Sequence, residues 1–180
     1  MSMVATEIGT VPISGFKWYF ILLEGPFKDE IRNEIDKHFL TLGKELGEDA
    51  IVIRGYEPTR FSKSVETAAF YEKKWKENIT APALIILNES PNALTNTDKL
   101  KKAKIMVFSL REIFEEAKTI APFLEKLLNA INEEDAIKAL EKLEKGKLRK
   151  FWGWVLKYGI AKPQFAGFGF DVSKALKELG

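Results

Sequence analysis

Four nearly continuous apolar runs stand out along the chain. They are 18–23, 50–53, 82–87 and 104–110. Apolar runs without regular polar alternation are typical of strands that are covered on both faces of a sheet. The pattern therefore predicts a sheet of about four strands with helices on both faces.

Apolar residues between these runs recur at helical spacing. After Gly25-Pro26 the spacing predicts an amphipathic helix that ends at Gly47 and carries an apolar stripe of Ile31, Ile35, Phe39, Leu42 and Leu46. Ser62 or Ser64 is expected to cap a second helix that turns Val65, Ala68, Ala69 and Trp75 inward. A further helix begins near Arg111, and Pro122 is expected to kink or split it.

Strands that alternate with helices indicate an α/β domain, which we place at 16–131. Before it we expect a loose N-terminal segment, 1–15. After it we expect a C-terminal helical extension, 132–180, packed on the domain. The chain has 180 residues, of which 46% are hydrophobic and 30% charged, so it can bury a core of this size.

Two short motifs resemble the thioredoxin-like fold superfamily over about 18–131. Glu24-Gly25-Pro26 leads from the first strand directly into the long helix, and Ile79-Thr-Ala-Pro82 opens the third strand. The family places redox cysteines near the position of Pro26 and a cis-proline at the position of Pro82. Because the chain has no cysteine, the resemblance implies the fold without the oxidoreductase activity.

The connection between the third and fourth strands leaves a second fold open. Residues 90–103 are longer than a tight β-hairpin and would also suit a crossover to a parallel fourth strand. The domain would then be a small flavodoxin-like or nucleotide-binding sheet. Pro82 would be an ordinary proline at the start of a strand.

Composition excludes several classes of site. Without cysteine there is no disulfide, thiol nucleophile or Cys-ligated zinc, and the lone His38 cannot form a His-rich metal site. We interpret His38, next to the apolar stripe of the first helix, as structural. The apolar runs are too short to cross a bilayer. We therefore expect a cytoplasmic protein with no membrane partner, no metal and no cofactor.

Polar residues that follow the strands form one candidate site. If the strands are mostly parallel, these residues meet at one edge of the sheet. Arg54 and Arg60 would hold a phosphate or carboxylate, and Glu24 or Glu89 would act as the acid or base. Tyr56 and Asn88 would complete the ligand-binding set. The alternative is that these residues only form surface ion pairs in polar loops; neither GxGxxG nor GxxxxGK[ST] occurs in the chain.

The C-terminal segment gives the second candidate site. Residues 145–170 include no acidic side chain, six basic ones and seven aromatic ones. On a helix from Lys147, the side chains of Lys150, Trp154 and Lys157 share one face with Lys147, opposite an apolar arc. Lysines beside an exposed indole suit single-stranded nucleic acid, because they contact phosphates while a base stacks. The alternative is a docking helix whose lysines only face solvent.

These two sites lead to different functions. The first hypothesis is a non-redox binding or adaptor protein that offers its basic-aromatic C-terminal surface to a nucleic acid or a protein. The second is an enzyme that acts on a small phosphorylated or nucleotide-like ligand at the strand ends. Homo-oligomerisation through 145–170 is a third possibility, since exposed aromatic side chains often mark interfaces.

Overall fold

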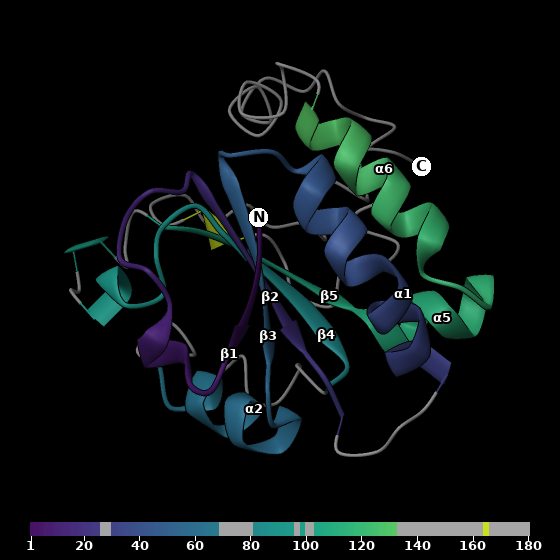
Figure 1. Ribbon diagram of the computed structural model, residues 1–180, viewed down its shortest axis with the longest axis horizontal. Coiled ribbons are helices and arrows are strands. Elements are labelled where there is room, and N and C mark those ends of the chain that lie inside the picture. Colours follow the sequence, from purple (N-terminus) through teal and green to yellow (C-terminus); the bar gives the residue numbers. More distant parts are fainter. Residues whose placement is uncertain (26–29, 69–80, 96–97, 100–102, 133–163, 166–180) are drawn as a thin grey trace, which may run out of the picture.

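The computed structural model describes residues 1–25, 30–68, 81–95, 98–99, 103–132 and 164–165. Its centre is a six-stranded mixed sheet in the order β1-β3-β2-β4-β5-β6 (Figure 1). The strands are β1 (Ser2–Ala5), β2 (Trp18–Leu23), β3 (Ala50–Gly55), β4 (Ala83–Leu87), β5 (Lys104–Ser109) and the two-residue β6 (Gln164–Phe165). The α/β class predicted from the sequence is therefore confirmed.

The directions of the strands test the alternative of a parallel fourth strand. The first three strands run parallel to one another, with β3 between β1 and β2. β4 runs antiparallel to β2 and to β5, with Leu84 opposite Leu22 and Phe108. The alternative of a parallel fourth strand is thus wrong, because the segment after β4 returns the chain in a hairpin. The Ala81–Pro82 peptide bond at the entry to β4 is cis.

Helices cover both faces of the sheet (Figure 1). On one face lie α1 (Glu30–Glu45), α5 (Leu110–Ala117) and α6 (Ala121–Asn132). On the other lie α2 (Pro58–Glu66) and the 3₁₀ turn η1 (Ile8–Thr10). A second 3₁₀ turn, η2 (Ala93–Thr95), lies in the connection from β4 to β5. Within the described parts of the chain, no helix has the length and apolar character needed to cross a membrane.

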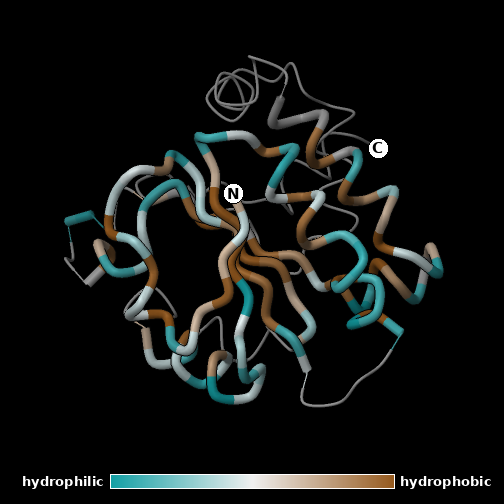
Figure 2. The backbone as a smooth tube through the Cα atoms, in the orientation of Figure 1, coloured by the Kyte–Doolittle hydropathy of each residue, from teal (hydrophilic) through white to brown (hydrophobic). Residues whose placement is uncertain are grey.

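This layering explains the unbroken apolar runs. Along β2, Phe20 and Leu22 face the layer of α1, α5 and α6, whereas Tyr19 and Ile21 face the layer of α2 and η1. All six residues of β2 are buried. Figure 2 shows the resulting apolar sheet between more polar helices. A strand at the centre of such a sandwich has no solvent-facing side, so polar alternation is absent.

Helix boundaries follow local chemistry. Ser109 caps α5 by accepting a hydrogen bond from the Glu112 backbone amide at 3.2 Å. Pro122 lies in the first turn of α6. The helix predicted to begin near Arg111 is therefore divided into α5 and α6, as expected. α2 starts at Pro58, earlier than the serines we expected as caps, because proline is well suited to the first turn of a helix.

The N-terminal segment is a correction to the predicted organisation. Instead of being loose, Ser2–Ala5 forms β1 and pairs with β3, and Ala5, Ile8 and Val11 are buried in the core beside α2. The sheet consequently has more strands than predicted. Of the predicted extension 132–180, Gln164–Phe165 pairs with β5 as an edge strand, and 133–163 and 166–180 lie outside the described residues.

Candidate functional site

Two of the predicted site residues, Glu24 and Arg54, form a bidentate ion pair. Glu24 follows β2 and Arg54 lies near the end of β3, and these strands are parallel neighbours. Arg54 Nε donates to Glu24 Oε1 at 2.9 Å, and Arg54 Nη2 donates to Glu24 Oε2 at 3.0 Å. The planar guanidinium thus matches both oxygens of one carboxylate.

Two residues of α1 extend this pair. Arg32 Nε lies 3.3 Å from Glu24 Oε2, and Arg54 Nη1 donates to Asp36 Oδ1 at 2.5 Å. The Arg54 guanidinium also lies 5.2 Å from the centre of the Phe39 ring, within the range of a cation–π contact. We call the four charged residues Glu24, Arg32, Asp36 and Arg54 the Glu24 cluster; its formal charges sum to zero.

The centre of the Glu24 cluster is shielded from water. The Glu24 side chain is 1% exposed, whereas that of Asp36 is 51% exposed. Burial raises the pKa of Glu24 above its ordinary value, and the charges of Arg54 and Arg32 oppose that rise. A carboxyl with a raised pKa suits acid–base chemistry in general. Here its oxygens are occupied by guanidinium groups and it has almost no solvent contact.

The predicted anion-binding pair of arginines does not form. Arg54 directs its donors to Glu24 and Asp36, while Arg60 on α2 forms an exposed ion pair with Glu7. Tyr56 follows β3 at the same end of the sheet as Arg54 and is 73% exposed. An anionic ligand would have to displace a carboxylate of the protein from either guanidinium.

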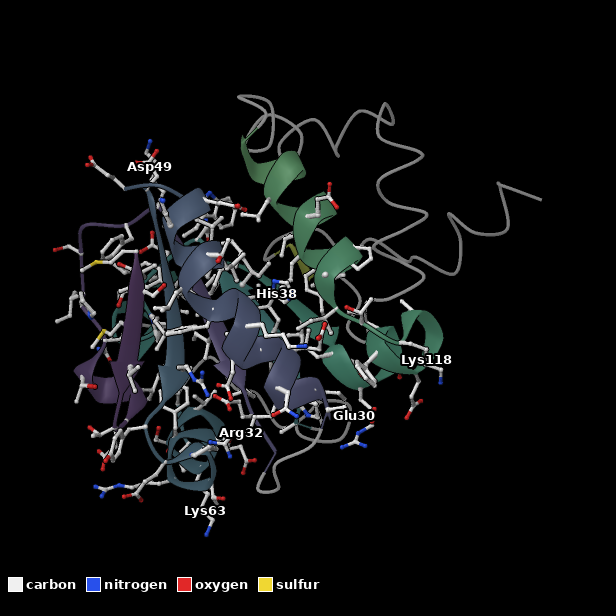
Figure 3. All side chains as sticks on the ribbon, turned by 45° about the vertical axis from the view of Figure 1, so that its right-hand side comes forward. Glu30, Arg32, His38, Asp49, Lys63 and Lys118 are labelled. Carbon is white, nitrogen blue, oxygen red and sulfur yellow. The ribbon has the colours of Figure 1, made fainter. Side chains whose placement is uncertain are left out.

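The predicted meeting of all strand ends at one edge is also wrong. Because β4 is antiparallel to β2, the end of β4 lies beside the start of β2, with Leu87 opposite Tyr19. Asn88 and Glu89 therefore lie at the opposite end of the sheet from Glu24. In Figure 3, Arg32 marks the end with the Glu24 cluster and Asp49, which precedes β3, marks the other.

The end of the sheet that holds Asn88 and Glu89 has its own polar contacts. Ser90 Oγ donates to the Pro12 carbonyl at 2.9 Å, and Asn92 Nδ2 donates to the Val11 carbonyl at 2.6 Å. The buried Tyr19 side chain contacts Ser90, and burial raises the pKa of Tyr19. These bonds fasten the connection before β2 to the connection after β4, so their evident role is structural.

His38 lies on α1, with 34% of its side chain exposed and Nε2 3.9 Å from Glu34 Oε2 (Figure 3). Among the described residues, no group of three or more His, Asp or Glu side chains could hold a metal ion. The predicted C-terminal surface of Lys147, Lys150, Trp154 and Lys157 lies outside the described residues.

Sequence reasoning missed Arg32 and Asp36 as members of the cluster. A signal for them is present in the sequence: each directly follows a core position of α1, Ile31 or Ile35, and they are four residues apart. They therefore lie one turn apart on the margin of the face that packs on the sheet. Their partner Glu24 is apparent only when β2 and β3 are placed side by side.

Comparisons of the chain with protein-family models, curated proteins and solved structures find no match. The functional argument therefore depends on the residues and geometry of this chain.

Proposed function

We propose that this protein is a non-redox binding or adaptor protein, in which a thioredoxin-like domain supports a basic-aromatic segment, 145–170, that binds a nucleic acid or a protein. The observation that carries the proposal is the composition of that segment, which combines six basic and seven aromatic side chains with no acidic one. Unopposed positive charge beside aromatic rings suits binding to the phosphates and bases of a single strand.

The thioredoxin-like part of the proposal is supported by the strand pairing. The resemblance requires a hairpin between the third and fourth predicted strands, and β4 and β5 are antiparallel neighbours. The position after β2 holds Glu24 in an ion pair with Arg54, and the chain has no cysteine, which supports a role without thiol chemistry.

The test is binding to a labelled single-stranded oligonucleotide across a range of salt concentrations. Replacing Lys147, Lys150 and Lys157 together by Ala should weaken binding and lower the slope of log K against log salt by about 2, since each phosphate contact on a single strand contributes roughly 0.7. Trp154→Ala should weaken binding without changing that slope, because stacking releases no counterions.

A matched control removes the same charge elsewhere. Lys17, Lys37 and Lys63 are exposed on the α/β domain, and replacing all three by Ala should leave the salt slope nearly unchanged. Equal effects of the two triple variants would show that only net charge matters. No binding to single- or double-stranded DNA or RNA at low salt would remove the nucleic-acid form of the proposal.

A further inference from the structure

The outer edge of β1 has backbone groups suited to a further strand. Among the residues that the structure describes, β1 is the outermost strand of the sheet and pairs with β3 alone. The carbonyls of Met1 and Ala5 accept hydrogen bonds from the amide of Val52 in β3 and from the amide of Tyr56, the residue after β3. Backbone groups alternate in direction along a strand, so those of Ser2 and Val4 point away from β3.

Exposed apolar side chains lie beside the outward-pointing backbone groups of Ser2 and Val4. Val4 is 52% exposed and Leu40 of α1 is 72% exposed. α1 lies directly against β1: Ser2 Oγ donates to the Phe39 carbonyl at 3.1 Å, and a Cβ on Gly43 would lie only 1.8 Å from Ser2 Oγ. Val4 and Leu40 therefore belong to one margin of the molecule, formed by β1 and the side of α1 next to it.

Two common protections against strand pairing are absent from this edge. Proteins often guard an edge strand with a charged side chain or a proline, and the four-residue strand Ser2–Ala5 contains neither. The β1 strand of a second copy is extended and uncharged as well, and its Ser2, two residues before Val4, is a small residue that can lie opposite Val4.

We propose that two copies of this chain associate through their β1 strands, which pair antiparallel about a two-fold axis at Met3. Ser2 of each copy then lies opposite Val4 of the other, and the two pairs exchange about four backbone hydrogen bonds. The two sheets become one continuous sheet. The same patch serves both copies, as a two-fold interface requires.

The charges on α1 favour a second copy of this chain over an unrelated strand as the partner of β1. Asp36, Leu40 and Lys44 follow one another at intervals of one helical turn. Both charged residues are exposed, and Asp36 also accepts a hydrogen bond from Arg54. When two copies of α1 run antiparallel about Leu40, Asp36 of each faces Lys44 of the other. The stripe is thus complementary to itself in charge, with an apolar centre.

The spacing of the elements also fits. α1 contacts β1 and β3, so its axis lies over the gap between these strands. Adding β1 of a second copy at the usual strand spacing places the two α1 axes about 10 Å apart, which is a normal distance for packed helices. Leu40 of one copy then reaches Leu40 of the other.

Oligomeric state measured by light scattering on the full chain tests the proposal. At micromolar concentrations the expected mass is twice the 20.5 kDa of the chain. Val4→Lys or Leu40→Lys should raise the dimer dissociation constant by about tenfold or more, because each brings a charge close to its own copy across the axis. Ile13→Lys is the matched control. Ile13 is similarly exposed, at 68%, but it lies away from the proposed interface: its neighbour Pro12 contacts Ser90 in the connection after β4.

Cross-linking tests the register independently of affinity. Residues at a non-hydrogen-bonded antiparallel position have Cα atoms about 4.5 Å apart, within disulfide range. A Met3→Cys variant of this cysteine-free chain should form a covalent dimer under mild oxidation, and an Ile13→Cys variant should not. Circular dichroism would show that each variant is folded.

Two results would overturn the proposal. One is a chain that stays monomeric over the whole concentration range and cross-links no faster through Met3→Cys than through Ile13→Cys. The other is a dimer that withstands both Val4→Lys and Leu40→Lys, because its interface would then lie elsewhere, for instance in 145–170. Neither result bears on oligonucleotide binding, so this proposal and the proposed function fail separately.

Discussion

Arg54 makes three kinds of contact within the Glu24 cluster and with α1. It bonds both oxygens of Glu24, donates to Asp36 and lies over the Phe39 ring. A buried ion pair adds little stability when complete, but removing one partner leaves a charge without compensation in a dry environment. Removing Arg54 should therefore lower the stability of the protein mainly because it leaves the buried Glu24 carboxylate without this partner.

We predict that Arg54→Met lowers the free energy of unfolding at pH 7 by about 3–5 kcal/mol. The loss of unfolding free energy caused by Arg54→Met should be smaller in acid. Burial already raises the pKa of Glu24, and loss of Arg54 raises it further; a raised carboxyl pKa gives stability that is present below the unfolded pKa and lost as pH rises through the folded one. Urea unfolding at pH 7 and near pH 4 measures both effects.

Arg60→Met is the control for this substitution. Both side chains of the Arg60–Glu7 ion pair are exposed to solvent. The free energy of unfolding of the variant should therefore match that of the parent protein at both pH values. A cost for Arg54→Met that is the same at both pH values would show that lost packing on Phe39, rather than the charge of Glu24, accounts for it.

At the scale of elements, the packing of α2 on β3 depends on the absence of a side chain at one position. A Cβ on Gly55 would lie 2.4 Å from Phe61 Cβ and 2.9 Å from Phe61 Cγ. Phe61 is fully buried and belongs to the core on this face. Gly55 is therefore required for close approach, and its replacement must push α2 away from the sheet.

We predict that Gly55→Ala lowers the free energy of unfolding by about 1–3 kcal/mol, the usual cost of overpacking a core. Gly9→Ala adds the same methyl group where no atom lies within 4 Å, and should change stability by less than about 0.5 kcal/mol. Thermal or urea unfolding of the two variants beside the parent measures the difference. Equal effects would contradict the steric explanation.

At the scale of the whole molecule, one carboxylate joins the helices of the α1 face. Thr119 Oγ1, just before α6, donates to Glu34 Oε2 of α1 at 2.5 Å. The same hydroxyl accepts from the Ala121 amide at 3.2 Å. The hydrogen bond from Thr119, together with that from Lys37, lowers the pKa of Glu34. The ionised form of Glu34 thus links residues far apart in the sequence.

The sign of the resulting pH dependence is opposite to that of Glu24. A lowered carboxyl pKa gives stability that is present above the unfolded pKa and lost as pH falls through the folded pKa. We predict that Glu34→Gln costs about 1 kcal/mol at pH 7, and that the difference from the parent vanishes in acid. Urea unfolding from pH 7 to pH 3 measures this, and Glu66→Gln, at an exposed position of α2, is the matched control.

Some elements were predictable because their pattern depends on local chemistry. The apolar run of β2 and the stripe of α1 appear in the sequence because the periodicity of each follows from its own backbone geometry. β1 was missed for a physical reason. It is short and lies at an edge, so its burial is partial and its sequence has no apolar run of the kind that marked the other strands.

The candidate site was predictable only in part for a related reason. Glu24 and Arg54 meet because β2 and β3 are parallel neighbours, which the intervening helix suggested. Asn88 and Glu89 were assigned to the same place on the assumption that β4 was parallel as well, and the reversal of that one strand moved them to the opposite end.

The sequence alone determined the four long apolar runs, the apolar stripe of α1 and the absence of thiol chemistry, because each of these is set by residue type and short-range spacing. Only the tertiary structure decided the direction of β4, the inclusion of β1 in the sheet and the partners of each charged side chain. Those features depend on which distant segments lie side by side. That choice is made by the combined burial of both faces of the sheet, which no local stretch of the chain specifies.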